Sequence, residues 1–348
     1  MELLLHFGLY KTGSSFLQTV CARNRELLSK SSIFFPSSSR EDDMLAGKIS
    51  PGNGNGLAQL MLYKDRAKLD LLLNGWIHLA EAEGCNRILI SDEALIHAFA
   101  EPASLSLFKT LVEQSGIQNV SCFAFFRDPV DHCISTFKHR AKKGAIASFE
   151  EWIENGYETM HRYRSFLDVY PTVPFKWLFR KYQRDSEKMI GSFFREWLNL
   201  DLHFPALELS VNPSLTLSEI AVIQEASRLN DRLPFHLYDR FIAIPYAQKE
   251  KDVELEQAYR AISYRIIERD MEVINRLNDV LIKMGSEPLD FEYVSPDSGN
   301  PHTIKLSRVQ VNAIMDATEY SKKYHVYILD KLRFTKRKLK RKIKQYSF

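Results

Sequence analysis

The chain has 348 residues, of which 45% are hydrophobic, and a formal net charge of +3. This size allows one large folded domain with added helices. Its four cysteines have no C-x-x-C spacing, no apolar stretch is long enough to span a membrane, and no signal peptide is visible. These features exclude a disulfide or metal-cysteine framework and a membrane-spanning helix, and they predict a cytoplasmic protein.

The first predicted element is a buried strand over residues 3–5, followed by the sequence HFGLYKTGSSFLQ over residues 6–18. A segment with helical spacing comes next. A turn between a strand and a helix N-terminus directs free N–H groups and the positive end of the helix dipole to one point. Around Gly13, the turn adds one cation and three hydroxyl groups: Lys11, Thr12, Ser14 and Ser15. The segment therefore predicts a phosphate site.

The nearest general motif to this turn is the P-loop, G-x-x-x-x-G-K-[ST]. Gly8 and Gly13 have its spacing, but Ser14 stands where the motif has its lysine, and Lys11 lies inside the loop. Because the P-loop lysine reaches the β- and γ-phosphates, its absence counts against triphosphate chemistry. Two interpretations stay open from the loop alone: a phosphate site, or an ordinary strand-to-helix turn that carries a lysine.

Residues 37–56 are rich in Ser, Gly, Asn and charge, and they predict a mobile insertion after a short strand at 33–35. It is either a lid that helps to recognise an acceptor or a plain surface loop. Residues 57–83 return to helical spacing. Residues 87–93, RILISDE, then predict a middle strand that ends in acidic residues.

Another buried strand is predicted over residues 120–126, followed at once by Arg127, Asp128 and Pro129. Pro129 suits the first turn of a helix and Asp128 suits its cap. Arg127 and Ser135, two turns into this helix, can hold one phosphate from two sides. The alternative is a capped helix with a surface arginine. This helix and the residues after it carry a basic rim, which consists of His132, His139, Arg140, Lys142 and Lys143. The rim faces an acidic sugar, nucleotide phosphates or only water.

The remaining elements continue an alternation of strands and helices. We expect a helix over 163–170, a strand over 173–179, a helix over 185–197, and long amphipathic helices over 253–284 and 306–332. The alternation predicts an α/β fold with a mainly parallel sheet, whose ligands bind beyond the carboxyl ends of the strands. Lys11, Glu93 and Arg127 all follow predicted strands, so we expect them to face one crevice.

Two segments carry a resemblance to a known family. The Lys-Thr-Gly-Ser-Ser turn resembles the 5′-phosphosulfate loop of sulfotransferases that use 3′-phosphoadenosine 5′-phosphosulfate (PAPS). The Arg-x-Pro sequence at Arg127, with Ser135 eight residues later, resembles their 3′-phosphate site. The pattern is similar to bacterial members, including those that modify polysaccharides, over about residues 1–230. It implies a P-loop-like three-layer sandwich with C-terminal helical additions, a domain over 1–300 with a helical region at 216–284, and a C-terminal segment over 301–348.

The resemblance also implies site roles. Lys11 would neutralise charge on the departing 5′-phosphate, the N–H groups of residues 12–15 would hold that phosphate, and no metal would be required. The product would be 3′-phosphoadenosine 5′-phosphate (PAP). Glycan-modifying members use a glutamate as base near the position of Glu93, whereas members that act on small phenols and alcohols use a histidine, for which His97 is the nearest candidate. Asp92 is a weaker candidate for the base than Glu93.

The acceptor is expected to be a glycan or a small molecule. Tyr157, Tyr163 and Trp177 are candidates for stacking on a sugar, with a place in the core as the alternative. Two rival functions stay open. One is a P-loop nucleotide kinase or NTPase in which Asp92 binds magnesium, and the other is a non-catalytic module that binds nucleotide or glycan.

The C-terminal tail carries most of the charge asymmetry. Residues 331–348 contain nine basic residues and no acidic one, whereas residues 1–330 contain 38 basic and 44 acidic residues. Such a tail suits peripheral binding to the anionic inner face of a membrane or to a polyanionic glycan, or it is a solvated terminus. Nucleic acid is an unlikely partner, because the tail lacks interleaved aromatic residues.

Overall fold

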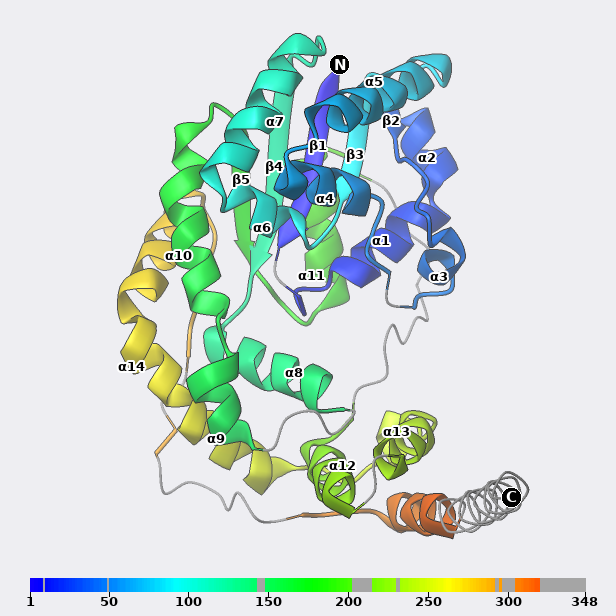
Figure 1. The fold of residues 1–348 in the computed structure, drawn as a ribbon, viewed down its shortest axis with the longest axis vertical. Coiled ribbons are helices and arrows are strands. Elements are labelled where there is room, and N and C mark those ends of the chain that lie inside the picture. The colour runs from blue at the N-terminus through cyan, green and yellow to red at the C-terminus, as the bar shows by residue number, and fades with distance from the viewer. Residues whose placement is uncertain are drawn as a thin grey trace, which may run out of the picture. The chain divides into compact units, whose positions relative to one another are not determined.

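The protein has an α/β fold built on one parallel sheet of five strands in the order β2-β3-β1-β4-β5 (Figure 1). The computed structural model describes residues 1–8, 10–48, 50–142, 148–201, 215–229, 232–291, 294–295 and 304–319. The strands are β1 (Glu2–Gly8), β2 (Ile33–Phe34), β3 (Arg87–Ser91), β4 (Asn119–Phe126) and β5 (Lys176–Lys181). Every neighbouring pair is parallel. The predicted α/β class and parallel sheet are therefore confirmed.

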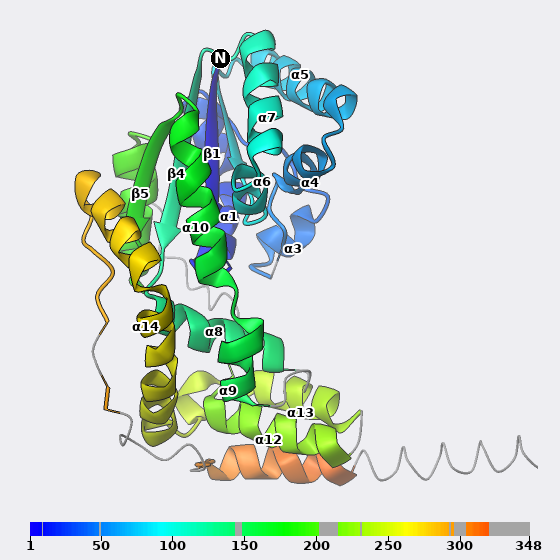
Figure 2. The same cartoon turned by 60° about the vertical axis from the view of Figure 1, so that its left-hand side comes forward.

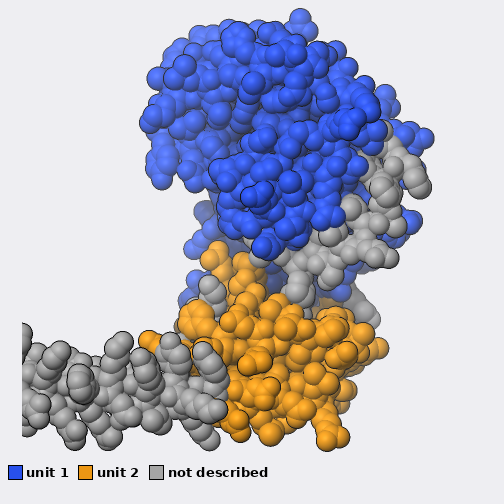
Figure 3. Space-filling model, turned by 90° about the vertical axis from the view of Figure 1, so that its right-hand side faces the viewer, with its two compact units in different colours: residues 1–136, 153–212, 263–293 blue, residues 137–152, 213–262, 294–348 orange. Residues whose placement is uncertain are grey.

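The contacts divide the chain into two units, drawn in blue and orange in Figure 3. Unit 1 comprises Met1–Thr136, Ile153–Asn212 and Ser263–Tyr293, and unit 2 comprises Phe137–Trp152, Pro213–Ile262 and Val294–Phe348. This division differs from the expected one, a domain over 1–300 and a segment over 301–348, because residues 137–152 and 213–262 group with the described part of the C-terminal segment. All the candidate site residues belong to unit 1.

Helices cover both faces of the sheet in unit 1. Because successive strand residues point to opposite faces, Leu4 packs in one apolar cluster and Phe7 in another. The Leu4 cluster joins the sheet to α1 (Ser14–Arg23), α2 (Arg25–Lys30), α11 (Ser186–Ile190) and the π-helix η3 (Gly191–Trp197). On the other face, the Phe7 ring lies 5.1 Å from that of Phe99 and 5.4 Å from that of Phe166. This double burial accounts for the continuous apolar runs in β1 and β4.

The face that carries Phe7 is covered by α6 (Leu95–Phe99), α7 (Pro102–Gln114) and α10 (Thr159–Val169). Helix α14 (Val253–Lys283) belongs to unit 1 from Ser263 onward, and this part runs beside α10 in Figures 1 and 2. Arg276 of α14 forms a 2.7 Å ion pair with Asp168 of α10. The predicted helix over 57–83 is two helices, α4 (Asn55–Tyr63) and α5 (Arg66–Ala82). They are separated by Lys64, which has a left-handed φ of 56°.

The insertion predicted at 37–56 is docked on the sheet in the described residues. It contains the short helix α3 (Glu41–Leu45), and its Met44 side chain is completely buried. The Asn53 side-chain amide donates to the Leu89 carbonyl at 3.0 Å and accepts from the Ser91 N–H at 2.7 Å. Both partners belong to β3, next to the two-residue strand β2. The described part of the segment therefore makes specific contacts with β3, whereas its predicted mobility stays a prediction.

Unit 2 contains α9 (Phe149–Glu151), α12 (Leu217–Leu229), α13 (Leu233–Ile242), the first part of α14 and a helical stretch over residues 308–319. A buried ion pair joins Glu219 on α12 to Lys249 at 2.9 Å, and the Gln310 side-chain amide donates to Glu219 at the same distance. Elsewhere in the unit, the Phe149 and Tyr259 rings stack with centroids 4.3 Å apart. This polar network and this aromatic pair hold helices that are distant in the sequence.

Some expectations fall on residues outside the described ranges. These are Lys143, the part of the expected 306–332 helix after residue 319, and the basic tail over 331–348. Within the described residues, no helix combines the length and the apolar character that crossing a bilayer requires. All four cysteines are buried and form no disulfide.

Candidate active site

The turn between β1 and α1 has a backbone that directs amide groups to the carboxyl end of the sheet. Lys11 and Gly13 have left-handed φ angles of 69° and 82°. A Cβ atom at Gly13 would lie 2.0 Å from Met189 Cε and 3.2 Å from Tyr182 Cε2, so this position requires glycine. Helix α1 starts at Ser14, and the Gly13 carbonyl accepts from the Phe16 and Leu17 N–H groups at 3.0 and 3.2 Å, so among the described residues the earlier amides of the turn are the ones left for an anion. The turn thus has the backbone of an anion site.

Arg127 connects the end of β4 to this turn. Its Nη1 donates to the Lys11 carbonyl at 2.8 Å, and its guanidinium lies over the Tyr182 ring at 5.1 Å from the centroid. The side chain is buried, yet its Nε has no hydrogen-bond partner among the described residues. Arg127 is therefore held at the turn while it keeps a donor for a ligand.

Helix α8 (Pro129–Ala141) begins as the sequence predicts. The Asp128 carboxylate accepts from the Asp131 N–H at 2.9 Å, which caps the helix. Ser135 lies half-buried two turns along it. Arg127 and Ser135 thus occupy the strand end and the helix expected for a phosphate site.

Glu93 follows β3 and meets the turn from the other side. The pKa of Glu93 is raised to about 7, and burial is the main cause. The neighbouring Asp92 also raises this pKa, whereas the Lys11 cation and the nearby Ser14 hydroxyl lower it. Glu93 therefore lies close enough to Lys11 for their charges to interact. The structure brings Lys11, Glu93 and Arg127 together beyond the carboxyl ends of three adjacent strands, β3, β1 and β4.

Asp92 is the more deeply buried of the two neighbouring carboxyl groups. Its Oδ1 accepts a hydrogen bond from the Ala94 N–H, and its Oδ2 has no partner among the described residues. Burial raises the pKa of Asp92 to about 7, and the Ala94 N–H opposes this shift. Near neutral pH, both carboxyl groups therefore exist as mixtures of acid and carboxylate.

His97 faces a cation. The Arg162 guanidinium lies 3.4 Å from His97 Nε2, so this nitrogen is the acceptor. Burial, together with a smaller effect of the Arg162 charge, lowers the pKa of His97 to about 4. The ring nitrogen that would take a proton from an acceptor is thus already engaged. Glu93 lies before α6, which begins at Leu95, so Glu93 and His97 are not on one helix, although their spacing of four residues would suit one helix face.

His132 and Tyr157 contact each other beside the turn, which differs from the places that the sequence predicts for them. His132 was grouped with a basic rim, but its ring is completely buried, and burial together with the Arg127 charge lowers its pKa to about 3. Its Nε2 lies 2.7 Å from the Tyr10 carbonyl and its Nδ1 lies 3.0 Å from the Tyr157 hydroxyl. Tyr157 and Tyr163 are core residues. The sequence signal that points to His132 is its spacing from Ser135, because residues three apart share a helix face.

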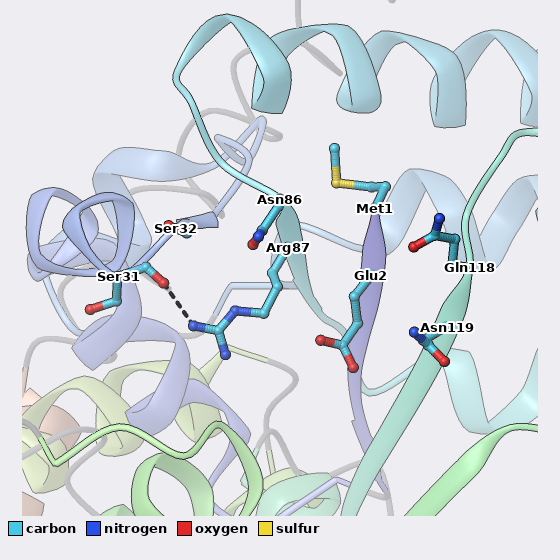
Figure 4. Close-up of a pocket in the computed structure, with 8 residues that line it drawn as sticks. All are labelled: Met1, Glu2, Ser31, Ser32, Asn86, Arg87, Gln118 and Asn119. Atoms are coloured by element: carbon cyan, nitrogen blue, oxygen red, sulfur yellow. Dashed lines mark hydrogen bonds between the residues drawn. The ribbon is translucent and has the colours of Figure 1, made fainter.

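A surface hollow lies at the opposite end of the sheet (Figure 4). Its lining includes the first residues of β1, β3 and β4, which are Glu2, Arg87 and Asn119. The Arg87 guanidinium is engaged there with the Ser31 carbonyl at 2.7 Å and the Leu198 carbonyl at 3.0 Å. Since ligands of open parallel sheets bind beyond the carboxyl ends of the strands, this hollow is not the candidate site.

The described residues contain no group of three or more His, Cys, Asp or Glu side chains arranged to hold a metal ion. The charged groups of the candidate site are instead one lysine, one buried arginine and two carboxyl groups. Comparisons of the chain with protein-family models, with curated proteins and with solved structures gave no match.

Proposed function

We propose that this protein is a PAPS-dependent sulfotransferase with a P-loop-like donor site. One observation carries the proposal: Lys11, Glu93 and Arg127 converge beyond the carboxyl ends of β1, β3 and β4. A cation beside a carboxyl group whose pKa is about 7 suits a reaction in which one oxygen loses a proton and another gains negative charge.

The donor half of the proposal rests on groups that suit two phosphates. The left-handed turn at Lys11 and Gly13 presents helix N-terminal amides to the 5′-phosphate. The buried Nε of Arg127, which lacks a partner among the described residues, and the hydroxyl of Ser135 suit the 3′-phosphate. Thr12, Ser14 and Ser15 add hydroxyl donors to the turn. These residues fit PAPS and its product PAP.

The acceptor half of the proposal assigns the base to Glu93. Its carboxylate takes the proton of the acceptor hydroxyl or amine as the acceptor atom forms a bond to sulfur. The bond from sulfur to the bridging phosphate oxygen breaks, and Lys11 stabilises the charge on that oxygen. Ionised Glu93 is substantially populated at neutral pH because its pKa is about 7. His97, whose Nε2 faces Arg162, is the weaker choice.

The acceptor class is proposed from the resemblance and is a glycan or polysaccharide. We further propose a cytoplasmic enzyme whose basic tail over 331–348 binds an anionic surface. The rival NTPase function is less well supported. Ser14 stands where a P-loop has its lysine, the group that reaches the β- and γ-phosphates.

Calorimetric titration with PAP, AMP and ATP–magnesium tests the proposal in the wild type, Ser135→Ala and Arg127→Ala. We expect the wild type to prefer PAP over AMP by tenfold or more, as about 1.4 kcal/mol of charge-assisted bonding requires. Arg164→Ala, which removes an exposed arginine of α10, is the matched control and should bind as the wild type does. Binding of ATP–magnesium alone would overturn the proposal. PAP binding without turnover of any PAPS–acceptor pair would favour a non-catalytic module.

A further inference from the structure

Two successive carbonyl groups of the turn are held by side chains from the end of β4 and the start of α8. The Tyr10 carbonyl faces His132 Nε2 at 2.7 Å, and the Lys11 carbonyl accepts from Arg127 Nη1 at 2.8 Å. Since both carbonyls are drawn toward α8, the backbone between them is fixed where Lys11 adopts its left-handed φ of 69°. A residue other than glycine is strained at a left-handed φ angle, so the backbone at Lys11 needs the support of these two hydrogen bonds.

The contacts of His132 define its tautomer. A carbonyl oxygen can only accept, so the nitrogen that faces Tyr10, Nε2, must carry the hydrogen. The ring is neutral, because it is completely buried and the charges of Arg127, Lys11 and Arg162 all oppose a positive charge on it. A neutral ring leaves Nδ1 as an acceptor, and the Tyr157 hydroxyl is placed to donate to it at 3.0 Å.

Tyr157 is itself well anchored. Its side chain is buried, and its one hydroxyl hydrogen can go to His132 Nδ1 at 3.0 Å or to the Pro129 carbonyl at 3.3 Å, of which the His132 contact is the shorter. Its own carbonyl accepts from Arg269 Nη2 at 3.4 Å, and Arg269 Nη1 donates to the Ile153 carbonyl at 3.2 Å. The hydroxyl is therefore presented to His132 from a fixed backbone. The bonds run in series from Arg269 through Tyr157 and His132 to Tyr10.

We propose that His132, held in the Nε2–H tautomer by Tyr157, is a positioning residue that sets the backbone of the phosphate turn and so aims Lys11 and the turn amides. The phosphate ligand rests on the proposed function, whereas the tautomer and the turn geometry do not. His132 does not contact the reacting atoms in this scheme. It acts through the Tyr10 carbonyl.

The tautomer is tested first by ¹⁵N NMR of the histidine-labelled protein. We expect His132 to show a protonated Nε2 and an unprotonated Nδ1, without titration between about pH 6 and pH 8, where an ordinary histidine changes charge. In Tyr157→Phe, which removes only the hydroxyl, the Nδ1 resonance should move because its donor is lost. A protonated Nδ1 or a titrating ring in the wild type would overturn the proposal.

Titration with PAP tests the positioning role. His132→Gln keeps an amide donor about as far from the backbone as Nε2, whereas the shorter Asn of His132→Asn cannot reach the Tyr10 carbonyl. A lost buried hydrogen bond corresponds to about a tenfold loss of affinity. We expect that loss in His132→Asn and near-complete rescue in His132→Gln. Thr136→Val is the matched control, because among the described residues the Thr136 hydroxyl bonds to carbonyls of its own helix, those of His132 and Cys133.

The outcomes separate this inference from the proposed function. If the wild type binds no PAP, the sulfotransferase proposal fails, and inorganic pyrophosphate replaces PAP as the probe of the turn. Equal affinity of His132→Asn and the wild type for the probe that the wild type binds would overturn the positioning role. So would equal losses in His132→Asn, His132→Gln and Thr136→Val, because these would indicate a general effect on folding.

Discussion

Arg127 donates to the main-chain carbonyl of Lys11 at 2.8 Å, across 116 residues of sequence. The residue proposed to bind the 3′-phosphate thus also supports the turn proposed to bind the 5′-phosphate. One side chain therefore contributes to both halves of the proposed donor site.

The first prediction follows from this double role. Arg127→Ala should weaken the binding of AMP as well as PAP, because the turn loses the support of a buried charged donor. Ser135→Ala should weaken only the binding of PAP. The measurement is calorimetric titration of both nucleotides into both variants. Unchanged AMP affinity in Arg127→Ala would show that the turn does not depend on Arg127.

The second prediction concerns the base. Glu93→Gln should lower kcat by about 10²–10⁴-fold, the usual contribution of a general base. In the wild type, kcat/KM should rise with pH and level off above about 7, because the base must be ionised and the pKa of Glu93 is about 7. His97→Gln is the comparison variant and should retain this profile. If His97→Gln abolishes turnover while Glu93→Gln does not, the assignment of the base is wrong.

The third prediction concerns Asp92, whose folded-state pKa of about 7 lies above its ordinary value of 3.8. The folded state therefore binds the proton more tightly than the unfolded state. The Asp92 contribution to stability is greatest below about pH 4 and is lost as the pH rises through about 7.

Asp92→Asn retains the acceptor for the Ala94 N–H but cannot ionise. It should raise the free energy of unfolding by about 2–4 kcal/mol at pH 8 and change it little at pH 4, as measured by urea denaturation. Since Asp92 also raises the pKa of Glu93, the pH profile of turnover should move to lower pH. Equal effects of the substitution at pH 4 and pH 8 would contradict this account.

The fourth prediction concerns Gly13, whose φ is 82° and whose missing Cβ leaves room for Met189 Cε. Gly13→Ala should lower the free energy of unfolding by about 2–4 kcal/mol, from left-handed strain and overpacking combined. Met189→Ala should recover part of that loss when combined with Gly13→Ala. A double-mutant cycle by denaturant unfolding measures the coupling, and strict additivity would show that Met189 does not restrict the position.

The fifth prediction concerns the buried pair of Glu219 and Lys249 in unit 2. Lys249→Met leaves the Glu219 carboxylate buried without this partner and should cost about 3–5 kcal/mol of unfolding free energy. The double variant Glu219→Gln/Lys249→Met removes both charges and should recover most of the loss. If the double variant is less stable than Lys249→Met, the charges themselves stabilise the unit. Chemical denaturation of the three proteins distinguishes these results.

Local patterns predicted much of the unit 1 sheet. Strands β1 and β4 are continuous apolar runs bounded by motif residues, and such runs are recognisable without tertiary information. Strand β5 was expected at 173–179 and lies at Lys176–Lys181. Among the described strands it pairs with β4 alone, and it carries polar residues at both ends, so no apolar run marks its bounds.

Other features depend on contacts between distant residues. The helix break at Lys64 carries no glycine or proline signal, and the end of the 185–197 helix is the π-helix η3. For the candidate site, the sequence predicted that Lys11, Glu93 and Arg127 face one crevice, because each of them follows a predicted strand. It could not show that His132 is buried and neutral, because that depends on Tyr157, 25 residues away, and on three cations from other elements.

The bonds that Asn53 makes to Leu89 and Ser91 also affect how the protein meets other chains. Strand β2 pairs with β3 only at Arg87 and Ile88, so the carboxyl half of β3 would otherwise present an unpaired backbone edge. Such an edge is a template on which strands of a neighbouring molecule can add. One side-chain amide occupies its donor and its acceptor at once. Together with the Gly54 N–H, which donates to the Ser91 carbonyl at 3.4 Å, Asn53 thus leaves this part of the β3 edge with no free backbone groups for strand addition among the described residues.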